Sequence, residues 1–78
     1  MASKVLIPMR LYLTKGANNE FVRWIQQRLI ALGFNCGKTG SDSYFGTLTL
    51  VAVQNFQASR GLKADGVVGQ LTTTQLLK

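Results

Sequence analysis

Few side chains in this sequence could do acid–base or metal chemistry. Its 78 residues include no histidine, one cysteine (Cys36) and three carboxylates, Glu20, Asp42 and Asp65. Metal sites built on His or Cys need several such ligands, and general acid–base catalysis most often uses histidine or a tuned carboxylate. The composition therefore argues against a metal centre and a cofactor. It leaves Asp42 and Asp65 as the pair that could be taken for catalytic carboxylates.

The two aspartates open the same short phrase. Residues 42–49 (Asp-Ser-Tyr-Phe-Gly-Thr-Leu-Thr) return as residues 65–72 (Asp-Gly-Val-Val-Gly-Gln-Leu-Thr). An Asp in this setting can accept a backbone N–H two residues on and close a turn, and a glycine can take a backbone conformation closed to other residues. Because both aspartates occupy the same position in the repeated phrase, we expect them to have the same role and interpret both as structural. The predicted turn residues are Asp42, Gly46, Asp65, Gly66 and Gly69, with Phe45 as an inward anchor.

Charge and hydropathy give broader limits. Nine Lys and Arg side chains give a net charge of +6, which favours an anionic partner such as nucleic acid, a membrane surface or an acidic polymer. The basic residues are spread along the chain, so a solvated surface is an equally good interpretation. No apolar run approaches the roughly 20 residues that span a bilayer. The short run at residues 5–7 is followed by Pro8, and we expect no export signal here.

Residues 19–32 form the strongest predicted helix. Its apolar positions recur at helical spacing, with Asn18 or Asn19 as cap and Gly33 as C-terminal stop, after which Phe34 folds back. The stripe comprises Val22, Ile25, Leu29 and Leu32, widened by Phe21 and Trp24. Trp24 could stack on a sugar, but its place beside the stripe favours the core.

Each copy of the phrase should launch a further helix. The first begins near Thr47, carries Val51, Ala52, Val53 and Phe56, and ends at Gly61 with Leu62 returning to the core. The second runs from about Gln70 to Leu77, with Leu71, Leu76 and Leu77 as buried candidates. The predicted fold is all-α: a compact three-helix bundle with an internal turn–helix repeat, in which residues 1–12 are an extended N-terminal lead-in and residues 13–78 the domain.

Three stretches carry a longer pattern that covers residues 13–77. The first runs from Val22 to Phe34 behind Gly16, the second from Asp42 to Gln57, and the third from Gly61 to Thr72. In order and spacing they resemble the peptidoglycan-binding-like domain family, small modules attached to bacterial and phage cell-wall hydrolases.

The resemblance implies a non-catalytic module that targets an attached hydrolase (an amidase, peptidase or glycosidase) to peptidoglycan. It implies action at the cell wall or outside the cell, or on the wall from inside in the case of a phage lysin. A monomer without a membrane span or a nucleic-acid partner is expected. Ser43 departs from the family pattern, which has Gly at that place, so the first turn should tolerate a small residue.

Peptidoglycan offers sugar hydroxyls, acetamido groups, lactyl ethers and peptide carboxylates. A receptor for it would combine amide and hydroxyl hydrogen-bonding groups, an aromatic surface and some positive charge. Structural or solvated roles are the alternative for each candidate, and they are slightly favoured for the two glutamines. The candidate ligand-binding residues are Gln26, Tyr44, Thr47, Thr49, Gln57, Arg60 and Lys63.

Other functions fit the sequence less well. A small basic nucleic-acid-binding helical domain would explain the charge, yet no helix is both polar and basic enough to serve as a recognition helix. A complete hydrolase would need more acid–base groups than three carboxylates. A metalloprotease propeptide would need an inhibitory cysteine motif, and Cys36 lacks the flanking Pro and Arg. We expect Cys36 to be a packing residue.

Overall fold

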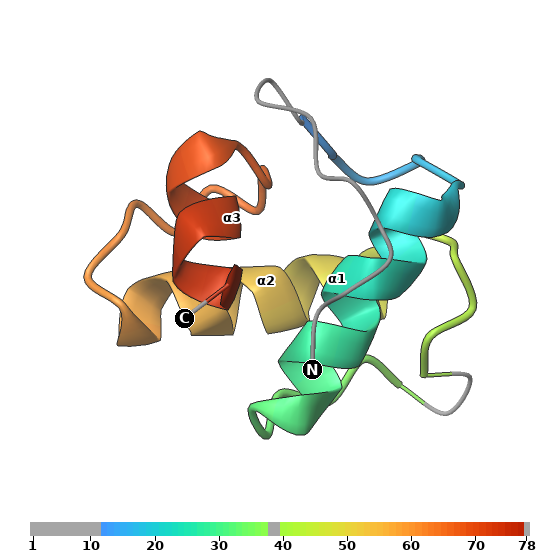
Figure 1. Ribbon diagram of the computed structural model, residues 1–78, viewed down its shortest axis with the longest axis horizontal. Helices are drawn as coiled ribbons and strands as arrows, with labels where there is room; N and C mark the ends of the chain where they lie inside the picture. Colours follow the sequence, from blue (N-terminus) through green and yellow to red (C-terminus); the bar gives the residue numbers. More distant parts are fainter. Residues whose placement is uncertain (1–11, 38–39, 78) are drawn as a thin grey trace.

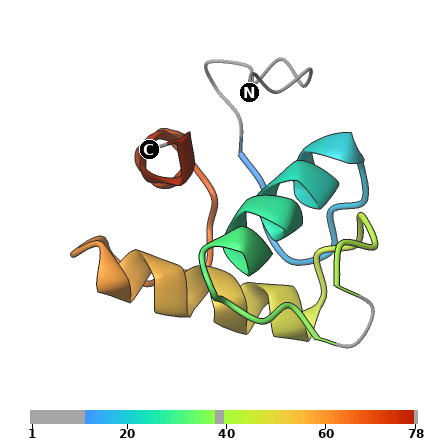
Figure 2. The ribbon, with the colours of Figure 1, turned by 60° about the horizontal axis from the view of Figure 1, so that its bottom comes forward.

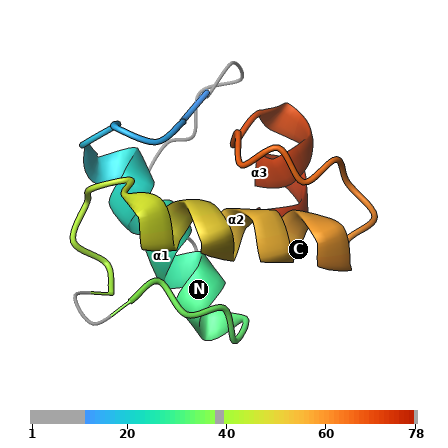
Figure 3. The ribbon, with the colours of Figure 1, turned by 180° about the vertical axis from the view of Figure 1, so that it is seen from behind.

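The computed structural model describes residues 12–37 and 40–77. Three helices make up this part of the chain: α1 (Glu20–Ala31), α2 (Thr47–Ser59) and α3 (Gln70–Leu77). α1 crosses α2, and α1 and α3 lie on the same side of it (Figures 1 and 2). From behind, α2 runs in front of both (Figure 3). The predicted all-α three-helix fold is confirmed, and nearly all of the lead-in predicted for residues 1–12 lies outside the described residues.

α1 begins at one of the two predicted caps. The Asn19 Oδ1 atom accepts the backbone N–H groups of Phe21 (2.9 Å) and Val22 (3.0 Å). These are two of the donors that a helix N-terminus leaves without an intrahelical partner. The extended backbone of Asn19 (φ −166°, ψ 179°) places its side chain over that turn.

The predicted apolar stripe of α1 faces the core. Val22, Ile25 and Leu29 are fully buried, and Trp24 is 5% exposed. The prediction that Trp24 is a core residue is therefore confirmed. Leu32 at the end of the stripe is half-buried and packs against the same cluster.

α1 and α2 end in the same way. The Phe34 N–H donates to the Leu29 carbonyl (2.8 Å), and the Leu62 N–H donates to the Gln57 carbonyl (2.9 Å). In each case the chain turns back through a glycine with positive φ and the returning residue is apolar, as the sequence predicts. The Phe34 ring then meets the Phe56 ring edge-on, with centroids 5.6 Å apart.

The buried face of α2 differs from the prediction at one residue. Ala52, Val53 and Phe56 are buried, whereas Val51 is 44% exposed. Buried positions at i, i+3, i+4 and i+7, starting from Thr49, lie on one side of the helix, and Val51 falls outside that stripe.

α3 differs more. Leu76 is buried as predicted, but the predictions for Leu71 (72% exposed) and Leu77 (59% exposed) are wrong. Thr72 and Thr73 take the inner face with Leu76. The physical reason is a tertiary hydrogen bond to Thr72 from α2, described below, which sets the rotation of this short helix about its axis.

A segment of residues 13–19, with a turn at Lys15 and Gly16, contacts both turns of the repeat; we call it the strap. Leu13 exchanges two backbone hydrogen bonds with Val68 (3.0 and 2.9 Å). Further along, the Phe45 N–H donates to the Ala17 carbonyl (2.8 Å). Phe45 and Val68 hold the same position in the two phrases and both are fully buried. The strap therefore links the two copies of the repeat.

Buried apolar side chains from the three helices, the strap and the turns form one cluster. A basic side chain links α1 to α3 beside this cluster. The Arg28 Nε atom donates to the Leu76 carbonyl (2.9 Å) at the C-terminal end of α3. A positive charge there is also favoured by the helix dipole. The cluster consists of Leu13, Val22, Trp24, Ile25, Leu29, Cys36, Phe45, Ala52, Val53, Phe56, Val68 and Leu76.

The sequence assigns the unusual backbone conformation of the first turn to Gly46, and this assignment is wrong. Gly46 has φ −97°, which any residue can adopt. The left-handed residues are the second ones of each turn, Ser43 (φ 73°) and Gly66 (φ 75°). A side chain at Gly66 would also overlap Leu50 of α2. The first turn thus accepts a Cβ in the left-handed region, whereas a Cβ in the second turn would require the Leu50 side chain to shift.

Gly66→Ala should therefore lower the free energy of unfolding by about 1–3 kcal/mol, through backbone strain and overlap with Leu50. Ser43→Ala is the matched control, since residue 43 already carries a Cβ at the equivalent place, and it should cost less than about 1 kcal/mol. Urea unfolding followed by circular dichroism measures both. Equal losses in the two variants would contradict the steric difference between the two turns.

Candidate ligand-binding site

A buried glutamine of α1 holds the first turn (residues 42–46). The Gln26 side chain is fully buried. Its Nε2 atom faces three oxygens, Asp42 Oδ1 (3.0 Å), the Tyr44 carbonyl (2.9 Å) and Thr49 Oγ1 (3.0 Å). Its Oε1 atom accepts the Ser43 N–H (3.0 Å). One amide therefore joins α1, the first turn and the first helical turn of α2.

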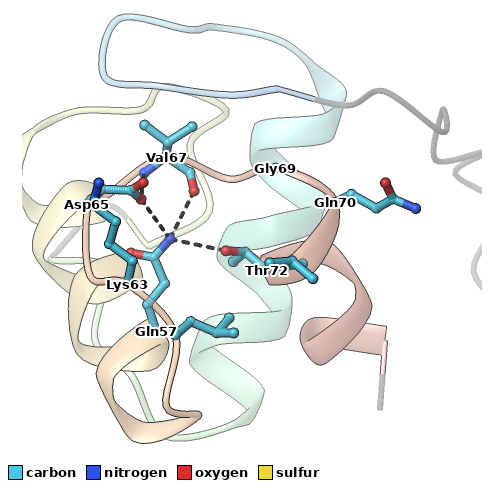
Figure 4. A pocket seen from close by; sticks show the side chains of 9 residues that line it. Gln57, Lys63, Asp65, Val67, Gly69, Gln70 and Thr72 are labelled. Carbon is cyan, nitrogen blue, oxygen red and sulfur yellow. Dashed lines mark hydrogen bonds between the residues drawn. The ribbon is translucent and has the colours of Figure 1, made fainter.

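A glutamine of α2 does the same for the second turn (residues 65–69), as Figure 4 shows. Gln57 is 1% exposed. Its Nε2 atom faces Asp65 Oδ1 (3.2 Å), the Val67 carbonyl (2.8 Å) and Thr72 Oγ1 (3.0 Å). Its Oε1 atom accepts the Gly66 N–H (2.9 Å). Every partner is the residue at the equivalent place in the second phrase.

Both aspartates are held in these turns. Asp42 Oδ1 accepts the Tyr44 N–H (3.0 Å), and Asp65 Oδ1 accepts the Val67 N–H (2.9 Å). The hydrogen bond from Val67 is the main reason that the pKa of Asp65 lies below its ordinary value, and Gln57 and the charge of Lys63 act in the same direction. The geometry gives both side chains the role of turn closure.

Two surface depressions lie beside these turns, at equivalent places in the repeat. The first depression has a volume of about 160 Å³ and the second about 240 Å³. The first is lined by Cys36, Asp42, Tyr44, Gly46, Thr47, Leu48 and Thr49. The second is lined by Gln57, Leu62, Lys63, Asp65, Val67, Gly69, Gln70, Leu71 and Thr72.

The seven candidate ligand-binding residues divide into two groups. Gln26, Thr49 and Gln57 are at most 3% exposed, and their side chains hydrogen-bond within the two networks. The other candidates are exposed: Tyr44, Thr47, Arg60 and Lys63.

Three of these exposed residues line a depression. Tyr44 and Thr47 line the first, and Lys63 lines the second. Arg60 lines neither, and its guanidinium lies 5.0 Å from the centroid of the Phe56 ring. The solvent-facing candidates that the structure brings to the depressions are therefore Tyr44, Thr47 and Lys63.

Sequence reasoning missed part of the lining. Gln70 and Leu71 border the second depression, and Leu48 borders the first. Aligning the two phrases would have found them, because Gln70 is the equivalent of Thr47, a candidate, and Leu71 is the equivalent of Leu48.

Cys36 lies at the floor of the first depression, 3% exposed. Burial raises the pKa of its thiol, and the negative charge of Asp42 adds to the effect. A buried thiol with a raised pKa is a packing group rather than a nucleophile, and the prediction of a packing role is confirmed.

Two further features of residues 12–37 and 40–77 bear on function. No three His, Cys, Asp or Glu side chains come together there in a way that could hold a metal ion. No helix of this part is long and apolar enough to cross a membrane.

Comparison with known proteins gives the family. The family model described as "putative peptidoglycan binding domain" matches residues 18–76. The chain belongs to the peptidoglycan-binding domain family. Its members are found attached to cell-wall hydrolases, and the domain itself is a non-catalytic binding module.

Solved structures agree with this assignment. A peptidoglycan-binding protein from Clostridioides difficile, crystallised with glutamine hydroxamate, is 38% identical with a TM-score of 0.83, over 90% of this chain and 42% of that one. The N-terminal domain of SleB is 39% identical with a TM-score of 0.80, over 86% of this chain and 89% of that one.

One curated relative carries the name of a cell-wall amidase. A "probable N-acetylmuramoyl-L-alanine amidase" of Bacillus licheniformis is 39% identical over 66 residues, which are 85% of this chain and 19% of the amidase. The chain thus spans about a fifth of the length of this relative.

The buried amides can be tested by an isosteric change. Gln57→Glu removes the donor to three oxygens and places a second negative charge beside Asp65, so it should lower the free energy of unfolding by about 3–5 kcal/mol. Gln27→Glu, the same change on the exposed face of α1, is the control and should stay within about 0.5 kcal/mol. Thermal and urea unfolding give both values. A loss below about 1 kcal/mol in the Gln57 variant would contradict the role assigned to this amide.

The lowered pKa of Asp65 has a defined consequence for acid stability. A carboxylate whose pKa is lower in the folded state adds stability above its unfolded pKa and loses it as the pH falls through its folded pKa. This part of the wild-type stability should therefore be lost as the pH falls from neutral through the ordinary pKa of an aspartate, about 3.9, and below it. Asp65→Asn keeps an acceptor oxygen and should show a smaller loss over the same range in urea unfolding. An unchanged pH profile would contradict this assignment.

Proposed function

We propose that this chain is the wall-binding module of a longer cell-wall hydrolase and that it holds the catalytic domain on peptidoglycan. The observation that carries the proposal is that Gln26, Gln57, Asp42 and Asp65 hydrogen-bond within the two turns. Since the buried polar groups are engaged internally, recognition falls to exposed side chains at the two depressions. Tyr44, Thr47 and Lys63 are the proposed ligand contacts.

The catalytic partner in this proposal is an amidase, peptidase or glycosidase. Support comes from the length of the chain relative to the amidase that it resembles, since the match leaves most of that enzyme for other parts. The module would act at the cell wall or outside the cell, or on the wall from inside as part of a phage lysin. We further propose that it works as a monomer.

The basic residues favour a dispersed field over a nucleic-acid site. Arg23 donates to the Ser43 hydroxyl (3.0 Å), and Arg28 donates to the end of α3. Arg60 lies over the Phe56 ring. Three of the described cations therefore have partners within the fold, at three separate places, whereas duplex recognition gathers cations on one face.

A co-sedimentation assay tests the proposed function. The chain fused to a fluorescent protein should pellet with purified sacculi at moderate salt, and an excess of soluble muropeptides should lower the pelleted fraction. The fluorescent protein alone is the control. Binding should be weak, because shallow sites on a small module gain strength mainly by multivalency. Stronger binding to duplex DNA than to sacculi would overturn the proposal.

A further inference from the structure

The two depressions are built on the same hydrogen-bonded frame, the buried glutamine with its turn partners, but some of the residues that line them differ. The side chains that hydrogen-bond to the two buried glutamines keep the same residue type, as in the Asp42–Asp65 and Thr49–Thr72 pairs. Among the other lining positions Leu48 and Leu71 are alike, but the first depression has Tyr44 and Thr47 where the second has Val67 and Gln70. The hydrogen-bonded frame is thus repeated, while two of the lining positions beside it differ.

In the first depression an aromatic ring is held in place. Tyr44 is 48% exposed. A Cβ added at Gly46 would lie 3.1 Å from the Tyr44 Cε2 atom and 3.3 Å from Cδ2, so the ring lies directly against the backbone of residue 46. At the equivalent Gly69 nothing lies within 4 Å of such a Cβ. The glycine of the first turn therefore serves to seat the ring.

A seated, half-exposed tyrosine is a preformed stacking surface. Ordering the ring before binding lowers the entropy cost of association, and the ring presents an apolar face and a hydroxyl together. The formal charge among the residues that line this depression is negative, from Asp42. The first depression therefore suits a neutral ring that carries hydroxyls and disfavours a carboxylate.

The second depression offers different chemistry. Lys63 and Gln70 are both exposed at its rim, and Figure 4 shows Lys63 beside the Gln57 network and the Gln70 side chain directed outward from it. An ammonium group gives three donors, and an amide gives donors and an acceptor. The Asp65 Oδ1 atom is occupied by Val67 and Gln57. This set suits a peptide that ends in, or carries, a free carboxylate.

We propose that the duplication has produced two sites of different specificity: the first depression takes an acetylated sugar against Tyr44, and the second takes the carboxylate-bearing stem peptide at Lys63 and Gln70. This division rests on the proposed function, since peptidoglycan carries both groups on one polymer. The two sites lie toward opposite ends of α2, because Thr49 of the first and Gln57 of the second are about 12 Å apart along its axis at about 1.5 Å per residue.

An NMR titration with two separate probes tests the division. The probes are an N-acetylglucosamine trisaccharide without peptide and a free stem peptide with its carboxylates intact. The trisaccharide should shift backbone amides in residues 44–49, and the peptide should shift those in residues 63–72. Amidation of the peptide carboxylates should weaken its binding about fivefold.

Variants separate the two sites. Tyr44→Val installs the residue that the second turn carries at the same place, and it should weaken trisaccharide binding about fivefold without changing peptide binding. Lys63→Gln should do the reverse. Lys15→Gln, which removes the same charge outside both depressions, is the control and should change neither affinity by more than about twofold.

The outcomes distinguish this inference from the proposed function. If the chain binds sacculi but both probes shift the same depression, or neither probe causes shifts, the division is wrong and the proposed function stands. Equal effects of the Lys63 and Lys15 variants on peptide affinity would also overturn it. Failure of the wild-type chain to bind sacculi would overturn the proposed function itself.

Discussion

The structure depends on a buried side-chain amide that is used twice. A primary amide removed from water costs free energy unless its donors and acceptor find partners, at about 1–3 kcal/mol for an unsatisfied group. Gln26 and Gln57 meet this condition only when the following turn closes and the next helix begins in register. The amide thus couples the end of one element to the start of the next, and the domain is a chain of two such couplings tied together by the strap.

This coupling explains why the carboxylates do structural work. Each aspartate shares one oxygen between the amide of a glutamine and a backbone N–H of its own turn. That arrangement needs an acceptor at a fixed place, and the same need recurs at the same position of the repeat. The side chains proposed to contact a ligand, Tyr44, Thr47 and Lys63, take no part in this arrangement.

Much of the fold could be predicted from the sequence because its signals are local. The apolar period and the cap of α1 set its bounds, and the repeated phrase located the starts of α2 and α3. The inner face of α3 could not be predicted, since its run of Leu and Thr has little helical periodicity and the bond from Gln57 to Thr72 sets its phase. Gly46 was misjudged for a similar reason: its need for a missing Cβ comes from the Tyr44 ring, a contact that no backbone rule reveals. Of the candidate site, the aromatic and basic contacts were predictable by chemistry, while the commitment of Gln26 and Thr49 to internal bonds required the fold.

The repeat also bears on how a domain of this size can recognise a polymer. Each depression is open and small, so each would contribute modest affinity by itself. In the proposed two-site arrangement, both sites lie on one helix, so the second contact would be an intramolecular event and the effective concentration would rise without any enlargement of the core. Release would then require both contacts to open. A repeated turn–helix unit could therefore give a small domain two contacts with a repeating polymer, because the same buried glutamine holds each turn while lining residues such as Tyr44 and Val67 differ.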